Sequence, residues 1–150
     1  MTRRLRPAGP PRHAVQTGPE GESICRPAED DEFASRENVR ILESWNTETD
    51  RELSIARARL GPGDATESHY LEGITERYLV IQGTGMVRIG TLPPAEVGPG
   101  DVVFIPAGVV QQITNTGSED LVFYCICTPA FEEDRYSGVT RPSQDESSDP

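Results

Sequence analysis

The sequence predicts an all-β fold: a single antiparallel β-barrel of about six to eight strands, with flexible N- and C-terminal tails. Short apolar runs typical of strands recur along the middle of the chain, and Gly- or Pro-rich turns separate them roughly every eight to twelve residues. No long stretch shows the period of about 3.6 residues that marks an amphipathic helix. With 150 residues, the chain is long enough for one compact core.

The barrel is expected to occupy residues 37–131. Residues 1–36 are rich in Pro, Gly, Arg and acidic side chains and lack an apolar period, so we predict a disordered or loosely attached N-terminal arm. Residues 132–150 are acidic and rich in Ser, which predicts a flexible C-terminal tail.

The strands of the predicted barrel follow one another with short turns between them. They are expected at Val39–Leu42, Leu53–Leu60, Glu76–Gln82, Met86–Ile89, Val102–Ile105, Gln111–Asn115 and Leu121–Cys127. The sequence Gly83-Thr84-Gly85 lies between two of these runs, as in a β-hairpin. Pro93-Pro94 and the glycines around residue 100 mark further turns.

Composition excludes several classes of function. All 14 basic residues are arginine, so Schiff-base chemistry, lysine general bases and Walker-type phosphate loops are excluded. The formal net charge of −11 argues against a nucleic-acid partner. No apolar run approaches the roughly 20 residues of a membrane helix, and no apolar segment follows the basic N-terminus. We therefore expect a cytoplasmic protein with no membrane partner. We also expect its three cysteines to be reduced thiols.

Two segments of the central region resemble the paired signature of the cupin superfamily. The first is GDATESHYLEGITERYLVIQG at residues 63–83, and the second is GDVVFIPAGVVQQITN at residues 100–115. The glycines and the proline that shape the turns stand at the spacing of that family. Together with the residues between them, the two segments span just over a third of the chain. The resemblance implies a single small cupin barrel of the jelly-roll type.

The same resemblance implies a metal site. Members of the family supply two histidines and a glutamate from the first segment and one histidine from the second. This sequence keeps His69 and Glu76, but Leu71 and Gln111 stand at the other two positions. What remains is an imidazole, a carboxylate and a carboxamide oxygen, a three-ligand set for one divalent ion such as Fe, Mn, Ni or Zn.

A site without metal is the alternative. His69 and Glu76 would then hydrogen-bond each other or act as an acid/base pair, with the pKa of Glu76 raised by an apolar cavity. Gln111 would contact a substrate carboxylate or amide. Leu71 makes the cavity more apolar, which favours a substrate with a ring or alkyl portion.

Three further side chains are candidates for contact with substrate. Arg57 and Arg59 share one face of a predicted strand, and if that face points inward, one of them offers a bidentate clamp for a carboxylate. Tyr78 lies on the same strand face as Glu76 and is a candidate general acid or hydrogen-bond donor to substrate, or simply an aromatic side chain of the barrel lining.

These observations favour a metal-dependent enzyme that acts on a small organic molecule inside the barrel. Oxygenation, isomerisation, dehydration and cyclisation all remain open, because the fold does not choose between them. The alternative is a non-catalytic binding protein, a sensor or carrier with an eroded metal site. We also expect a homodimer, with Val39–Leu42 lying against the second copy, because an open barrel leaves strand edges to be covered.

Overall fold

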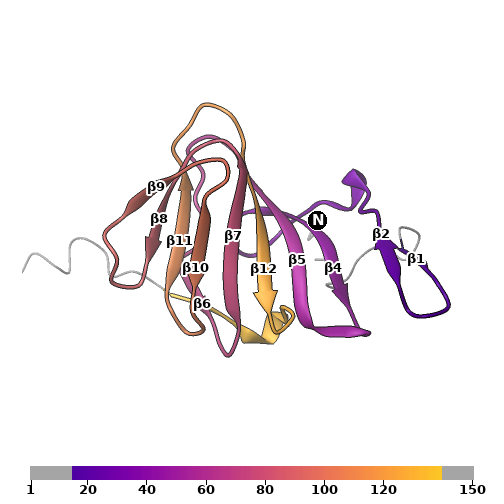
Figure 1. The fold of residues 1–150 in the computed structure, drawn as a ribbon. Coiled ribbons are helices and arrows are strands. Elements are labelled where there is room, and N and C mark those ends of the chain that lie inside the picture. Colours follow the sequence, from indigo (N-terminus) through magenta and orange to yellow (C-terminus); the bar gives the residue numbers. More distant parts are fainter. Residues whose placement is uncertain (1–14, 140–150) are drawn as a thin grey trace, which may run out of the picture.

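A computed structural model describes residues 15–139, and almost all of its regular structure is β-strand. The strands form a six-stranded sheet, a five-stranded sheet and a separate two-stranded hairpin, and all pairings are antiparallel (Figure 1). The predicted all-β barrel is therefore confirmed. No helix within residues 15–139 is long and apolar enough to cross a membrane.

The six-stranded sheet has the strand order β10-β7-β12-β5-β4-β3. Its strands are β3 (Phe33–Ala34), β4 (Arg40–Thr47), β5 (Asp50–Leu60), β7 (Thr75–Gln82), β10 (Val102–Ile105) and β12 (Leu121–Thr128). The longest strand, β5 with 11 residues, lies near its centre, and the neighbouring β4, β7 and β12 have eight residues each.

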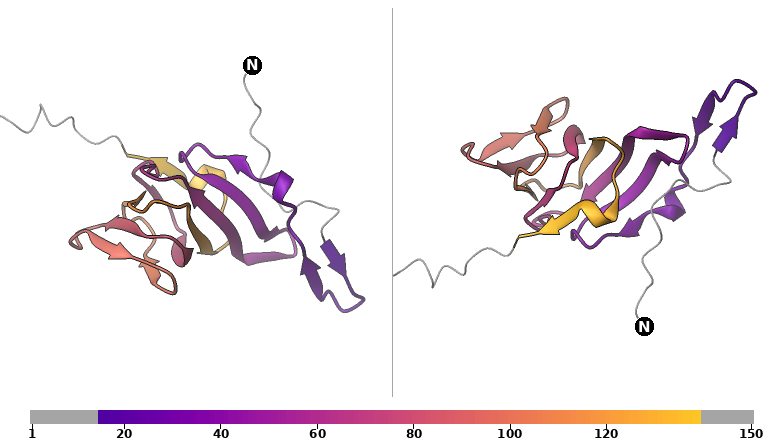
Figure 2. Two further views of the ribbon diagram at one scale, coloured as in Figure 1. Left: turned by 90° about the horizontal axis from the view of Figure 1, so that it is seen from above. Right: turned by 90° about the horizontal axis from the view of Figure 1, so that it is seen from below.

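The five-stranded sheet has the order β13-β6-β11-β8-β9 and faces the first across the core. Its strands are β6 (His69–Leu71), β8 (Gly85–Ile89), β9 (Ala95–Val97), β11 (Gln111–Asn115) and β13 (Tyr136–Gly138). The remaining elements are β1 (Val15–Thr17), β2 (Ser23–Cys25) and the short 3-10 turns η2 (Glu29–Asp31) and η3 (Glu133–Arg135). The β1–β2 hairpin projects from one end of the molecule (Figure 2).

Alternation along each strand decides which side chains form the core. In β11, for example, Gln111, Ile113 and Asn115 are buried, whereas the two residues between them are partly exposed. The main core cluster combines inward-facing side chains of both sheets, among them Val80, Ile105, Ile113, Leu121 and Phe123. These five are at most 1% exposed, so this end of the barrel is closely packed.

One turn glycine is required by a close approach. Gly83, between β7 and β8, has a φ of +83°, and a Cβ placed there would lie 2.7 Å from the carbonyl oxygen of Asp120. The hairpin predicted from the Gly83-Thr84-Gly85 sequence therefore depends on this residue.

Both predicted arms contain more structure than expected. Strand β3 pairs with β4 and closes one edge of the six-stranded sheet, and β13 pairs with β6 in the other sheet. These strands have two and three residues, too few for an apolar period, so the sequence pattern could not reveal them. The predictions for residues 1–14 and 140–150 lie outside the described residues.

The predicted dimer contact also needs correction. Of the Val39–Leu42 segment, Arg40 and Ile41 pair with β3 of the same chain. This stretch is therefore not a free edge within residues 15–139. Self-association itself stays a prediction.

Candidate functional site

A cavity of about 60 Å³ lies against the inner face of the six-stranded sheet. Its walls come from the chain between β3 and β4, from β4, β5, β7 and β12, and from the segment around η3. Its lining includes Phe33, Arg36, Glu37, Ile41, Glu43, Glu76, Cys125, Cys127, Phe131, Glu133 and Tyr136. Acidic, aromatic and sulfur-containing groups thus meet in one small space.

Glu76 is the central polar group of this cavity. The side chain projects inward from β7, where Glu76 is paired with Ile105 on one side and Cys127 on the other, and it is only 7% exposed. The Cys127 thiol donates a hydrogen bond of 3.5 Å to Oε2, whereas Oε1 is buried and has no hydrogen-bond partner. Burial raises the pKa of Glu76 to about 7, although the Cys127 hydrogen bond opposes this shift.

Tyr78 and Gln111 contact each other beside Glu76. The Tyr78 hydroxyl donates a hydrogen bond to Oε1 of Gln111, and the two side chains are 2% and 1% exposed. The carboxamide oxygen that was expected to bind metal is therefore already in use. Tyr78 also packs on Phe123, with ring centroids 4.7 Å apart, so it belongs equally to the core.

His69 is oriented by the backbone and by an aromatic ring. Its Nδ1 lies 2.7 Å from the carbonyl oxygen of Glu67, which favours the tautomer in which Nδ1–H donates. The ring stacks on Tyr136, with centroids 4.8 Å apart, and Nε2 lies 3.8 Å from Oε2 of Glu37. Burial lowers the pKa of His69, so the imidazole is neutral near pH 7. Tyr136 and Glu37 line the cavity, and His69 stands behind them.

Glu37 is a site residue that the sequence did not reveal. It precedes β4, lines the cavity and has a side chain that is 20% exposed. Burial, and after it the charge of Glu76, raises the pKa of Glu37. A single glutamate at the start of the predicted barrel, outside both motif segments, carries no signal of this role.

Leu71 supports the cavity from outside its walls. It is 2% exposed and belongs to a small apolar cluster with Ile74, Cys127 and Tyr136, against which Phe131 packs. Three of these neighbours line the cavity. The predicted apolar influence of Leu71 on the site therefore acts through the residues that it packs against.

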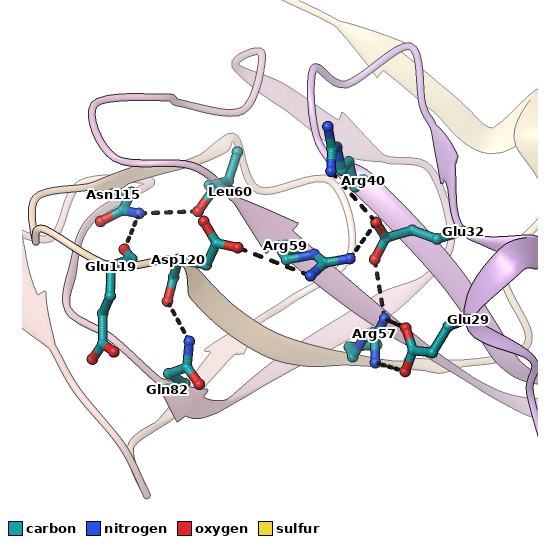
Figure 3. Close-up of polar contacts among 10 residues, drawn as sticks. All are labelled: Glu29, Glu32, Arg40, Arg57, Arg59, Leu60, Gln82, Asn115, Glu119 and Asp120. Atoms are coloured by element: carbon teal, nitrogen blue, oxygen red, sulfur yellow. Dashed lines mark hydrogen bonds and ion pairs between the residues drawn. The ribbon is translucent and has the colours of Figure 1, made fainter.

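The structure contradicts the predicted substrate clamp. Arg57 and Arg59 point away from the cavity, because the small side chains of Ser54, Ala56 and Ala58 take the inward positions of β5. Figure 3 shows both arginines on the carboxylates of the N-terminal segment.

This outer ion-pair network is closely spaced. The two terminal nitrogens of Arg57 lie 2.7 and 2.6 Å from the carboxylate of Glu29. The Glu32 carboxylate accepts hydrogen bonds from Arg57 at 3.0 Å and from Arg59 at 2.5 Å. The network therefore holds η2 and β3 against the sheet, which explains why this part of the predicted arm is ordered.

A second hollow of about 310 Å³ lies beside this network and is lined by Arg40, Arg59, Asp64 and Asp120, among others. Its charged groups already face one another, with Arg59 3.9 Å from Asp120. Arg40 lies 3.9 Å from Glu32 of the same network. We therefore place the candidate site at the smaller cavity.

The residues present do not fit the expected metal ion. Within residues 15–139, no three His, Cys, Asp or Glu side chains come together in a way that could hold one. Leu71 supplies no donor, and the Gln111 oxygen accepts the Tyr78 hydroxyl. The imidazole of His69 faces Glu37 rather than completing a ligand set with Glu76. Of the three predicted ligands, Gln111 is thus hydrogen-bonded to Tyr78, and His69 faces Glu37 instead of Glu76.

The cysteines are free, as expected. Cys125 and Cys127 lie two positions apart on β12, and both line the cavity. Burial raises the pKa of each thiol, so both are protonated near neutral pH. Here Cys127 serves as a weak hydrogen-bond donor to the Glu76 carboxylate.

Comparison with known proteins connects this geometry to a family. The family described as "Cupin domain" matches residues 56–127, which run from β5 to β12. A protein of Thermotoga maritima described as "Oxalate-binding protein" is 33% identical over 72 residues, which make up 48% of this chain and 59% of that protein. The chain thus spans less than two thirds of the length of this curated relative.

Solved structures agree on the fold. A predicted oxalate decarboxylase from Thermotoga maritima has a TM-score of 0.56 and 28% identity, and the match covers 61% of this chain and 80% of that one. A protein of Klebsiella pneumoniae with a double-stranded β-helix domain has a TM-score of 0.59 and 18% identity, covering 77% of this chain and 90% of that one. Two walls of the cavity, at residues 33–43 and 131–136, lie outside the stretch that matches the family.

Proposed function

Because the chain belongs to the cupin superfamily, we propose that it binds a small organic molecule in the cavity beside Glu76, and that Glu76 contacts this molecule directly rather than through a metal ion. One observation carries the proposal. Oε1 of Glu76 is a buried carboxylate oxygen that lacks a hydrogen-bond partner, and its side chain lines the cavity.

The energetic reason is the cost of burying such a group. A buried polar atom without a hydrogen bond costs roughly 1–3 kcal/mol, and an ionised one costs more. A ligand that donates a hydrogen bond to Oε1 removes this cost on binding. Relief of this cost at Glu76 therefore adds to the free energy of ligand binding.

The size of the cavity limits the ligand. A water molecule needs roughly 10–15 Å³ of such space, so about 60 Å³ holds about four to six waters, or a molecule with a similar number of heavy atoms. Metabolites of a few carbon atoms have this size. The curated relative is named for binding oxalate, itself a small molecule, which supports binding as the class of function.

A metal-dependent enzyme, the function favoured by the sequence, has less support. Its ligand set would need Gln111, whose oxygen accepts the Tyr78 hydroxyl, and His69, whose free nitrogen faces Glu37. The proposal therefore routes no chemical step through a metal ion.

A second candidate function is acid–base catalysis on the bound molecule. The observation that favours it is the pKa of about 7 for Glu76, because a general base works best when its pKa lies near the pH at which it acts. Tyr78, held on Gln111, and the Cys127 thiol would orient the carboxylate. His69 would keep Tyr136 and Glu37 in position rather than carry the proton itself.

A ligand screen tests the proposal. Full-length protein is screened by thermal shift against small acids, amines, alcohols and amides, and each hit is measured by calorimetry. Hits are then repeated with Ala56→Leu, which fills the cavity from β5, and we expect it to lose binding of every true hit while keeping a cooperative melt. If no molecule binds, or if binding survives Ala56→Leu, the proposal is wrong.

The same hits separate binding from catalysis. Bound molecules are incubated with the protein in D₂O, and NMR records incorporation of deuterium at carbon. A binding protein gives none, whereas an acid–base enzyme gives exchange that Glu76→Gln abolishes. Elemental analysis of the purified protein is expected to find no stoichiometric divalent metal. A stoichiometric ion lost in His69→Ala would instead support the metal-dependent enzyme.

A further inference from the structure

The walls of the cavity carry an excess of negative groups. Of the described residues that line it, four are glutamates, namely Glu37, Glu43, Glu76 and Glu133, and Arg36 alone is basic. Arg36 is exposed, and its guanidinium lies over the ring of Tyr136, 4.3 Å from the centroid. Lysine is absent from the whole chain. Burial raises the pKa of Glu37 to about 8 and that of Glu76 to about 7, so both carry charge at alkaline pH, where an anionic ligand would meet like charges on most sides.

The unpartnered oxygen of Glu76 points to the charge that is missing. Only 7% of the surface of Glu76 is exposed, and its Oε1 has no hydrogen-bond partner. A carboxylate in this setting is stabilised most by a donor that also carries positive charge, because hydrogen bonds between charged groups are about twice as strong as neutral ones. The Cys127 thiol, a weak donor on the other oxygen, does not supply this.

The remaining walls suit the apolar part of such a ligand. Phe33, Ile41 and Phe131 line the cavity together with Tyr136. Aromatic faces attract cations as well as alkyl groups. Tyr136 shows this attraction within the chain, because its ring carries the guanidinium of Arg36; since the ring also stacks on His69, Phe33 and Phe131 are the aromatic walls offered to a ligand.

From these three observations we propose that the ligand is a small organic ammonium compound, whose nitrogen donates to Oε1 of Glu76 and whose alkyl portion packs against the aromatic walls. This rests on the proposed function and names its ligand class. It also separates this chain from its curated relative, since oxalate is an anion and this cavity favours the opposite charge.

Three molecules of nearly the same shape test the ligand charge. Isobutylammonium, isobutanol and isobutyrate are titrated into the full-length protein by calorimetry at pH 8, where Glu76 is ionised. We expect isobutylammonium to bind at least about tenfold more tightly than isobutanol, and isobutyrate to bind more weakly than both. In Glu76→Gln the ammonium should lose this advantage and bind no better than the alcohol. Glu48→Gln removes the same charge from an exposed turn outside the cavity and should leave the affinity unchanged.

Three outcomes overturn the ammonium proposal, and none of them is by itself a failure of the proposed function. If isobutyrate binds most tightly, or if Glu76→Gln keeps the preference for ammonium, the ligand class is wrong. If one of these two results is found and Ala56→Leu still removes binding of the alcohol or the acid, the cavity remains the ligand site and only the ammonium is excluded. If none of the three binds, the ammonium proposal is wrong. The proposed function then depends on the wider ligand screen.

Discussion

On the outer side of the six-stranded sheet, the carboxylates of Glu29 and Glu32 lie against guanidinium groups of β5 (Figure 3). On the inner side of the same sheet, Glu76 has a thiol at one oxygen and no partner at the other. The outer charges are paired and hold a segment of chain in place. Hydrogen bonds from its neighbours only partly offset the burial of this inner carboxyl group, so its pKa is raised to about 7. On the outer side, guanidinium–carboxylate pairs hold a segment of chain, whereas on the inner side an unpartnered carboxylate oxygen faces the cavity of the candidate site.

The two sides should also respond to pH in opposite senses. The hydrogen bond from Arg57 lowers the pKa of Glu29. Burial by itself would raise the pKa of Glu32, but the hydrogen bonds from Arg59 and Arg57 outweigh burial, so the pKa of Glu32 is lowered too. Groups of this kind stabilise the fold above their unfolded pKa, and their contribution is lost as the pH falls. Burial raises the pKa of Glu76, so its contribution to stability falls as the pH rises.

The largest effect is expected from Glu76→Gln. The folded protein holds a proton on Glu76 that the unfolded chain releases between pH 4.5 and about 7, so the free energy of unfolding falls as the pH rises through this window. Replacing the carboxyl by a neutral amide should stabilise the protein by about 3 kcal/mol at pH 8 and by little at pH 5. Urea denaturation at both pH values measures the difference.

The control for this variant is Glu96→Gln, at an exposed position of β9. It should change stability by less than about 0.5 kcal/mol at either pH. If Glu76→Gln instead destabilises the protein equally at pH 5 and pH 8, Glu76 is compensated inside the fold, and the contrast between the two sides of the sheet is lost.

Glu32→Gln breaks the paired side and should have a smaller effect of the opposite sign. The Glu32 side chain is 9% exposed and accepts from both Arg57 and Arg59, so its removal leaves two partly buried guanidinium groups short of a partner. We expect a loss of about 1–2 kcal/mol at pH 7, and hydrogen exchange should show β3 opening more often. An unchanged exchange rate in β3 would mean that the network does not hold this strand.

Glu29→Gln should have the smallest effect. The Glu29 side chain is 69% exposed, although its bidentate contact with Arg57 is short. Ion pairs that exposed are worth little, so the change in unfolding free energy should stay below about 1 kcal/mol and shrink further in high salt. A loss as large as that of Glu32→Gln would show that bidentate geometry, rather than burial, gives the network its strength.

The barrel could be predicted from the sequence because its strands are long enough to show a pattern. The segments predicted at Val102–Ile105 and Gln111–Asn115 are β10 and β11, and Glu76–Gln82 differs from β7 by one residue. Strands of two or three residues, such as β3 and β13, carry no period and were missed. Their positions depend on pairing and ion pairs between distant parts of the chain.

The site was predictable only in part, for a related reason. Alternation along β5 showed that Arg57 and Arg59 share a face, but not that this face points outward. The small side chains of Ser54, Ala56 and Ala58 could have identified the inward face of β5, because side chains beside a cavity must leave space for it. Glu76 was found from the motif, whereas Glu37 and Tyr136 enter the site through tertiary packing that no local pattern encodes.

The walls at residues 33–43 and 131–136 lie outside the stretch that defines the family, and this has an evolutionary consequence. The matched strands carry Glu76 and the cysteines of the cavity, whereas most of its aromatic and additional acidic lining comes from the two flanking segments. After gene duplication, substitutions in these two flanking segments would alter the ligand while the matched strands kept their sequence. Relatives that share the strands could then differ in the ligand that they bind while they keep the fold.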